Sequence, residues 1–164
     1  MKKKFIEIQK FNQAWIWMIG IIPALIVLST LGVELTKKDK QDFGDLIALS
    51  FSFLIITVTF VWIKLIRLET VIDMNGIHIK YKGLFINKKI LLMEIKSAEI
   101  KTYDPLWEYG GWGIKYSFKR GWCYNVSGDK GILLHLTSGK NIMIGTQLPE
   151  EAMQALNSLQ IKTA

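Results

Sequence analysis

Hydrophobic residues follow two different patterns along the chain. Two segments near the N-terminus, residues 14–33 and 46–63, contain no charged side chain. A helix rises about 1.5 Å per residue, so each segment is long enough to cross a hydrocarbon layer of roughly 30 Å. From Leu68 onward, apolar and polar residues alternate in short runs separated by turn residues, which is typical of β-strands. The pattern predicts an α+β membrane protein with a two-helix hairpin followed by a mostly β domain.

Charge predicts which side of the membrane each part occupies. Residues 1–13 contain four lysines and one glutamate, and lysine and arginine favour the cytoplasmic side, so both termini are predicted to be cytoplasmic. Trp15, Trp17 and Trp62 lie at the predicted inner ends of the spans, as in an interfacial aromatic belt. The predicted parts are a cytosolic basic N-terminus (1–13), a first transmembrane helix (14–33), a short extracytoplasmic loop (34–45), a second transmembrane helix (46–66) and a cytosolic domain (67–164).

Small residues in the first span indicate how the hairpin packs. Gly20 and Ala24 lie one turn apart, and small residues let transmembrane backbones approach closely. In an antiparallel hairpin, residues at equal depth face each other, which predicts a contact between Gly20 and Thr59. The alternative is that Gly20 and Pro23 face lipid. Neither span contains an ionisable residue, which argues against a transporter, an ion pathway or a proton relay.

The domain after the hairpin is predicted to contain about seven short antiparallel strands and one C-terminal helix. Asn75-Gly76 favours a tight β-hairpin, because both central residues of that turn need positive φ. Pro149 followed by two glutamates is a typical helix start. Met153 and Leu156 form the apolar stripe of this helix, which is expected to close the open end of a bent sheet. The predicted strands lie within 70–73, 77–82, 84–92, 95–101, 113–118, 122–126, 131–136 and 141–145.

Several short motifs in the second half of the domain carry a family resemblance. They are Tyr103-Asp104-Pro105, Gly110-Gly111-Trp112-Gly113-Ile114, Tyr124-Asn125, Gly128, Gly131-Ile132, Gly139-Lys140, Ile144-Gly145-Thr146 and Pro149-Glu150. With the preceding hairpin, the chain resembles bacterial pleckstrin-homology-like (PH-like) membrane proteins. The resemblance implies a PH-like seven-stranded partial β-barrel or sandwich capped by a C-terminal α-helix, in the bacterial inner (cytoplasmic) membrane. It implies a binding or scaffold module and supplies no catalytic residues. Only Lys80 and Lys82 match the basic cluster of phosphoinositide-binding relatives, so no such lipid site is predicted.

An aromatic segment, residues 103–124, is the candidate functional region. Two interpretations of it stay open. In one, Trp112 and Trp122 fill the domain interior and the neighbouring glycines let the chain bend around them. In the other, exposed tryptophans flanked by cations contact a partner protein or an anionic lipid surface. The candidate binding residues are Trp107, Tyr109, Trp112, Lys115, Lys119, Arg120 and Trp122.

The cysteine and histidine content and the charge balance exclude several classes of function. Cys123 is the only cysteine, and His78 and His135 are far apart without clustered ligands, so no metal site, cofactor or catalytic residue is predicted. Residues 67–164 carry thirteen basic and nine acidic side chains, which is too weak a balance to suggest nucleic acid. The sequence therefore predicts a non-enzymatic, membrane-anchored interaction module, such as an accessory or assembly subunit. The alternative is a small-ligand sensor or enzyme that uses the Gly110–Gly113 loop as a pocket lip. The oligomeric state is left open.

Overall fold

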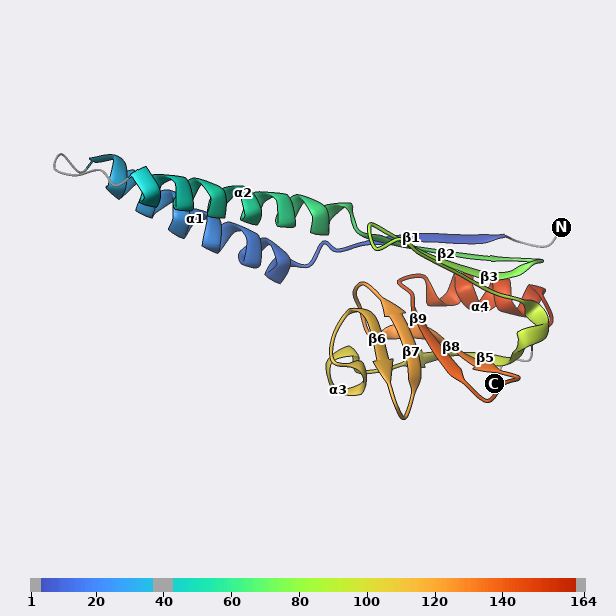
Figure 1. Ribbon diagram of the computed structural model, residues 1–164. Coiled ribbons are helices and arrows are strands. Elements are labelled where there is room, and N and C mark those ends of the chain that lie inside the picture. Colours follow the sequence, from blue (N-terminus) through green and yellow to red (C-terminus); the bar gives the residue numbers. More distant parts are fainter. Residues whose placement is uncertain (1–3, 37–42, 162–164) are drawn as a thin grey trace. The chain divides into compact units, whose positions relative to one another are not determined.

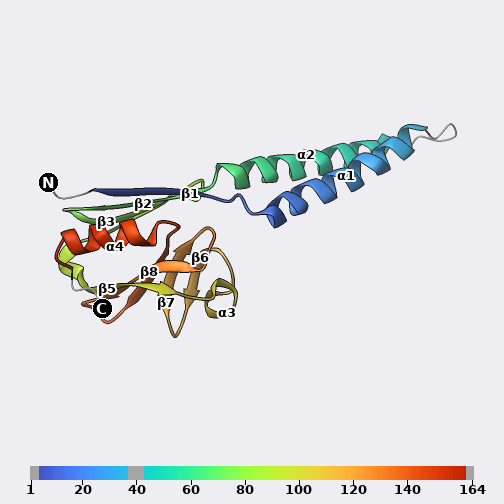
Figure 2. The ribbon, with the colours of Figure 1, turned by 180° about the vertical axis from the view of Figure 1, so that it is seen from behind.

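The computed structural model describes residues 4–36 and 43–161 and divides the chain into two compact units. Residues 11–65 form one unit, which contains two long helices. The chain up to Lys10 joins the chain from Ile66 onward in the second unit, which contains every β-strand of the described residues. Figure 1 labels these elements, and Figure 2 shows them from behind. The predicted α+β class, with two apolar helices followed by mostly antiparallel sheets, is confirmed.

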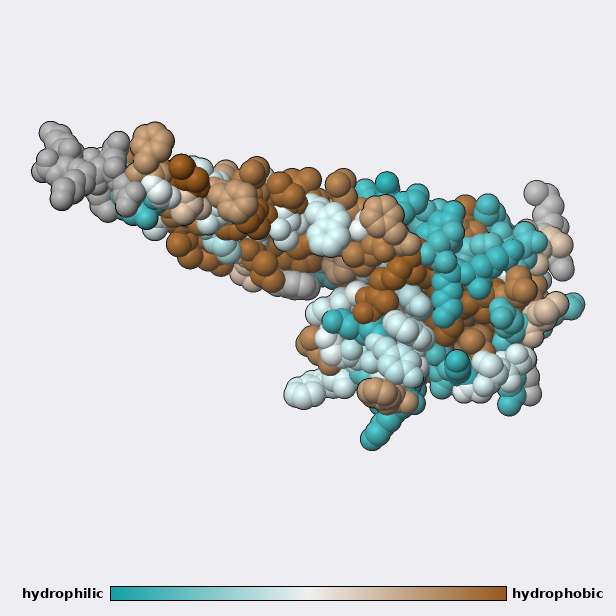
Figure 3. Space-filling view, viewed as in Figure 1, coloured by the Kyte–Doolittle hydropathy of each residue, from teal (hydrophilic) through white to brown (hydrophobic). Residues whose placement is uncertain are grey.

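The helices α1 (Ala14–Thr36) and α2 (Phe43–Leu65) are both long and apolar enough to cross a membrane. Hydrophobic side chains cover them in Figure 3, and no residue of α2 is buried. Both helices extend into the predicted loop 34–45, whose centre, residues 37–42, lies outside the described residues. The side chain of Trp15 is likewise outside the description, so its predicted place in an aromatic belt stays a prediction.

Polar side chains on the two helices carry their own hydrogen-bond partners. Five hydroxyl groups donate to backbone carbonyls three or four residues earlier, at 2.8–3.1 Å. A hydroxyl satisfied in this way can enter an apolar environment without leaving an unpaired donor. The residues are Ser29, Thr30, Thr36, Ser52 and Thr57.

Gly20 packs where α1 meets α2. A methyl group at Gly20 would overlap the ring of Phe60, and that ring also lies edge-on to Trp17, with 5.3 Å between centroids. Gly20, Thr59 and Phe60 line the same apolar groove of about 230 Å³ between the helices. The predicted depth match of Gly20 with this part of α2 therefore agrees with the packing, although Phe60 is the side chain that Gly20 accommodates. Ala24 is half-buried one turn further along α1.

Gly20→Ala is expected to weaken the helix pair, whereas Gly32→Ala is not. Both substitutions make the same change inside α1, but an added methyl at Gly32 would meet no atom within 4 Å. Overpacking against Phe60 is expected to cost about 1–2 kcal/mol, which thermal unfolding of the full chain in detergent would measure. Adding Phe60→Ala to Gly20→Ala should reduce the loss. Equal midpoints for the two glycine variants would contradict the packing role of Gly20.

The strands form two sheets. The first has the order β1-β2-β3-β4 and is antiparallel throughout, and the second has the order β5-β8-β9-β7-β6, with only the β7–β9 pair parallel. The strands are β1 (Phe5–Lys10), β2 (Arg67–Asp73), β3 (Gly76–Lys82), β4 (Ile86–Ile90), β5 (Ile95–Thr102), β6 (Gly113–Ser117), β7 (Gly121–Asn125), β8 (Lys130–Leu136) and β9 (Asn141–Gly145). The short helices η1 (Leu92–Glu94) and α3 (Pro105–Tyr109) flank β5.

Residues 5–10 of the predicted basic N-terminus form an edge strand of the first sheet. Strand β1 pairs along its whole length with β2, which follows the second helix in sequence. Its alternation is inverted relative to an ordinary edge strand, because Ile6 and Ile8 face outward while Glu7 and Gln9 face inward. The inward side chains are hydrogen-bonded, with Gln9 Nε2 donating to the Gly145 carbonyl at 2.6 Å. A strand with polar inward residues gives no core signal in the sequence, which explains why it was not predicted.

Helix α4 (Pro149–Ser158) lies between the two sheets (Figures 1 and 2) and contacts β1 and β2 on one side and β5 and β8 on the other. The sequence predicted this helix at the open end of a single bent sheet. Instead, it buries Ala152, Ala155 and Leu156 between two sheets, so both sheets share one core. Small alanines on the buried face let the flanking strands approach the helix closely.

Candidate functional site

Helix α3 holds Trp107 away from the domain. Asp104 caps this helix by accepting hydrogen bonds from the backbone N–H groups of Leu106 and Trp107, at 2.9 and 3.0 Å. Gly110 ends it in the left-handed conformation, with φ 76°. Trp107 is 90% exposed, in agreement with the interpretation that one tryptophan of this segment projects from the surface.

Tyr109, which was a candidate surface residue, lies instead in the core. Its ring meets Tyr103 edge-on with 5.8 Å between centroids, and both belong to a buried cluster with Cys123, Leu133 and Met143. Burial raises the pKa of Cys123 to about 12, so its thiol stays protonated near neutral pH. The cluster is therefore structural, and Cys123 does not supply a nucleophile.

Asn125 is a fully buried hydrogen-bond centre that joins the two sheets. Its Oδ1 accepts from the Gly113 backbone N–H and its Nδ2 donates to the Tyr103 hydroxyl, both at 2.8 Å. The Tyr81 hydroxyl of the first sheet donates to the Asn125 backbone carbonyl, also at 2.8 Å. Burial raises the pKa of Tyr81 and of Tyr103, which keeps both hydroxyls available as donors.

Two glycines pack against this centre. Gly131 and Gly145 are direct partners on β8 and β9. A methyl at Gly145 would lie 2.7 Å from Asn125 Cβ, and one at Gly131 would lie 2.7 Å from Met143 Sδ and 3.2 Å from the Tyr103 ring. Much of the motif pattern on which the family resemblance rests is thus accounted for by close packing.

The β6–β7 hairpin carries a continuous row of aromatic rings. Tyr116 and Trp122 are cross-strand partners with 5.1 Å between centroids, and Phe118 at the hairpin tip meets Tyr116 edge-on at 5.5 Å. Trp122 stacks on Tyr124 at 6.2 Å, and Lys88 Nζ lies 5.8 Å from the Tyr124 ring. Tyr124 is buried, Trp122 is 42% exposed and Phe118 is 96% exposed. The row is therefore fixed at its buried end and open at the other.

Cations surround the open end of this row. A pocket of about 240 Å³ lies at this end of the row. It is lined by Lys119, which is exposed, and by Lys140 from the β8–β9 turn. Arg120 pairs with Glu108 of α3, which ties the hairpin tip to the helix that presents Trp107. Lys115 is half-buried on β6. We define the hairpin surface as Tyr116, Phe118, Lys119, Arg120, Trp122 and Lys140.

Trp112 has an intermediate position. It is half-buried, and its Nε1 donates to the Gly128 carbonyl at 3.2 Å. Gly110, Gly111 and Gly113 all have positive φ, as the density of glycines predicted. Trp112 also lines a cavity of about 390 Å³ together with Thr102, Tyr103, Asp104, Pro105, Leu106, Glu108 and Asp129.

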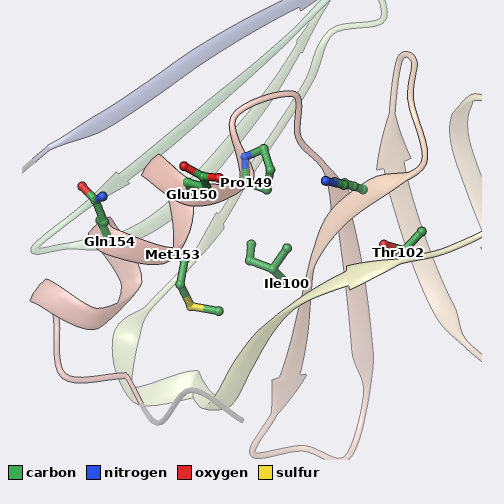
Figure 4. Close-up of a pocket in the computed structure, with 7 residues that line it drawn as sticks. Ile100, Thr102, Pro149, Glu150, Met153 and Gln154 are labelled. Atoms are coloured by element: carbon green, nitrogen blue, oxygen red, sulfur yellow. The ribbon is translucent and has the colours of Figure 1, made fainter.

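A further cavity of about 530 Å³, which was not predicted from the sequence, lies between α4 and β5. Figure 4 shows Met153 and Gln154 of α4 and Ile100 of β5 around this space. Met153 was predicted in the buried stripe of the helix, and it lines this cavity because α4 lies between two sheets. Lys130 and Glu150 supply its charged side chains.

The histidines of the two sheets each face a single carboxylate. Among residues 4–36 and 43–161, no group of three or more His, Cys, Asp or Glu side chains is placed to hold a metal ion. His78 faces Asp73 at 3.7 Å on the first sheet, and His135 faces Glu99 at 3.8 Å on the second. No protein-family model and no curated protein matches this sequence.

Proposed function

We propose that this chain is a non-enzymatic, membrane-anchored interaction module that binds a partner protein through the hairpin surface. The observation that carries the proposal is the aromatic row, which ends in a phenylalanine that is 96% exposed beside Lys119. Apart from its edge contact with Tyr116, this side chain buries almost no surface within the domain. Rings fixed by stacking on a buried neighbour lose little conformational entropy on binding, and tryptophan, tyrosine and arginine are enriched at interface hot spots.

The fold supports anchoring by a two-helix hairpin. Strand β1 precedes α1 and β2 follows α2, yet the two strands are paired along their length. Paired strands lie on one side of a membrane, so the chain between them must cross it an even number of times. Basic residues flank both helices on that side, which supports a cytoplasmic position for both termini. The resemblance to bacterial PH-like membrane proteins supports the inner membrane and an accessory or assembly role.

Copurification of the full chain in mild detergent tests this proposal. Phe118→Ala and Lys119→Glu are each expected to release a partner that the unchanged protein retains. Phe85→Ala is the matched control, because Phe85 is also 96% exposed but lies in the β3–β4 turn. A partner lost equally from the Phe85 and Phe118 variants, or retained by every variant, would contradict a binding role for the hairpin surface.

A ligand-binding sensor is the second candidate, because Trp112 lines the cavity of about 390 Å³ beside the Gly110–Gly113 loop. Two of the three carboxylates that line this cavity already have structural roles, since Asp104 caps α3 and Glu108 pairs with Arg120. Native mass spectrometry of the full chain distinguishes the two candidates. A retained small molecule that is lost on Trp112→Ala would favour the sensor.

A further inference from the structure

The outer face of the first sheet carries three cations in one row. Lys10 on β1 lies opposite Arg67 on β2, and Arg67 lies opposite Lys82 on β3. Directly opposed residues on antiparallel strands point to the same face of the sheet, and all three side chains are exposed. In the adjoining row, Lys80 adds a fourth cation. In Figure 3, hydrophilic residues gather over this sheet.

This row has more positive charge than its neighbours neutralise. Like charges directly opposite one another destabilise a sheet. Glu69 pairs with Lys82 at 2.8 Å, and the cations around it hold its carboxyl pKa below the usual range. Arg67 also acts on the Glu69 carboxyl at longer range, but the ion pairs among the described residues include neither Lys10 nor Arg67. An external anion would therefore relieve repulsion that the fold itself leaves in place.

The chain connections limit how far Lys10 and Arg67 can lie from the helix ends. Arg67 follows the end of α2 at Leu65 by two residues, and Lys10 precedes the start of α1 at Ala14 by four. Extended chain spans at most about 3.5 Å per residue, so these separations cannot exceed roughly 7 and 14 Å. The polar headgroup region on each side of a bilayer is roughly 5–7 Å thick. The Arg67 backbone therefore cannot lie more than about one headgroup thickness beyond the end of α2, and the Lys10 backbone no more than about twice that distance from the start of α1.

We propose that Lys10, Arg67 and Lys82 bind the phosphate groups of anionic lipids in the leaflet that adjoins the domain. The inference rests on the membrane anchoring in the proposed function, but it uses a surface distinct from the hairpin surface. Lysine and arginine near a negatively charged leaflet attract its headgroups, and the attraction falls off within a Debye length. Lipid bound here would fix the first sheet at the headgroups and leave the β6–β7 hairpin to its partner.

The test compares thermal unfolding of the full chain in nanodiscs of phosphatidylcholine with and without phosphatidylglycerol. The anionic lipid is expected to raise the midpoint of the unchanged protein by roughly 4 °C. The variant Lys10→Gln/Arg67→Gln/Lys82→Gln should lose this shift. The control Lys96→Gln/Lys101→Gln/Lys130→Gln removes three charges from the second sheet and should keep it. Measuring the lipid-dependent shift within each variant separates binding from the loss of the Lys82–Glu69 pair.

The possible outcomes are distinct. Absence of a shift in the unchanged protein, or an equal loss in both triple variants, would overturn the inference. If inorganic phosphate added to neutral nanodiscs causes a similar shift, the proposal that the row binds lipid phosphate specifically is refuted. If alkaline carbonate extracts the protein from membranes, the anchoring in the proposed function fails. A protein that stays in the membrane without any lipid-dependent shift refutes only the present inference.

Discussion

Asn125→Ala is expected to lower the free energy of unfolding by about 3 kcal/mol, and the melting temperature by more than roughly 10 °C. The substitution removes both hydrogen bonds of the Asn125 side chain. The Gly113 N–H is left without its acceptor and the Tyr103 hydroxyl without its donor. Tyr103 belongs to the buried cluster that includes Tyr109 of α3 and Cys123 of β7, and Gly113 begins β6. Thermal or chemical unfolding of the full chain in detergent measures the loss.

Asn87→Ala is the matched control for this prediction. Asn87 is exposed on β4, so the same change in side chain should alter stability by less than about 0.5 kcal/mol. Asn125→Asp is also informative, because a carboxylate keeps an acceptor for Gly113 but cannot donate to Tyr103. Stability equal to that of the unchanged protein in all three variants would show that the two side-chain hydrogen bonds of Asn125 do not stabilise the domain.

Glu7→Ala is expected to lower the free energy of unfolding by about 2–3 kcal/mol, although Glu7 lies in the segment that was predicted to be a basic N-terminus. Its Oε2 accepts from Thr146 Oγ1 at 2.6 Å and its Oε1 accepts from the Gln147 N–H at 2.7 Å. Thr146 in turn accepts from the Leu148 N–H at 3.1 Å, just before α4 begins. Glu7 thus links the edge strand of the first sheet to the start of the helix between the sheets. Glu150→Ala in the exposed first turn of α4 is the control, with an expected loss of about 0.5 kcal/mol.

The same carboxyl makes stability depend on pH. Burial raises the pKa of Glu7 above 4.5 and Glu151 adds to this, while hydrogen bonds from Thr146 and Gln147 oppose it. A carboxyl with a higher pKa in the folded state holds its proton more tightly there, so its contribution is largest below the unfolded pKa. That contribution decreases as pH rises from about 4.5 through the raised pKa of the folded state. Glu7→Gln should remove it.

Unfolding midpoints of Glu7→Gln and the unchanged chain at acidic and neutral pH test this dependence. The unfolding midpoint of the variant, relative to that of the unchanged chain, should be higher at neutral pH than at acidic pH. A difference that is constant across the range would mean that Glu7 titrates alike in the folded and unfolded states. Both Glu7 predictions require β1, so experiments on the domain should keep residues 4–10 together with the chain from Ile66 onward.

The predicted strands and the C-terminal helix were located well, because their signals are local. The predicted β2–β3 hairpin is present, but its turn residues are Met74 and Asn75, because Asp73 pairs with Gly76, and of the predicted pair Gly76 alone has positive φ. The observed β3 spans Gly76–Lys82, with Ile77, Ile79 and Tyr81 buried. Pro149 begins α4 as predicted. The site was predicted only in part: Trp107 and Lys119 are exposed, whereas Tyr109 is buried and Trp112 is half-buried. Phe118, which is the most exposed ring of the hairpin surface, was absent from the predicted set.

The sequence alone determined which segments are apolar enough for a membrane and where strands and turns lie, because composition and short-range periodicity reflect local backbone preference and burial. Only the tertiary structure decided that β1 completes the first sheet, that α4 lies between the sheets, and that Tyr109 faces inward while Phe118 faces outward. Those outcomes depend on contacts between residues far apart in the chain. Glu7 and Thr146 are the clearest case, since each is a buried polar residue whose partner is 139 positions away.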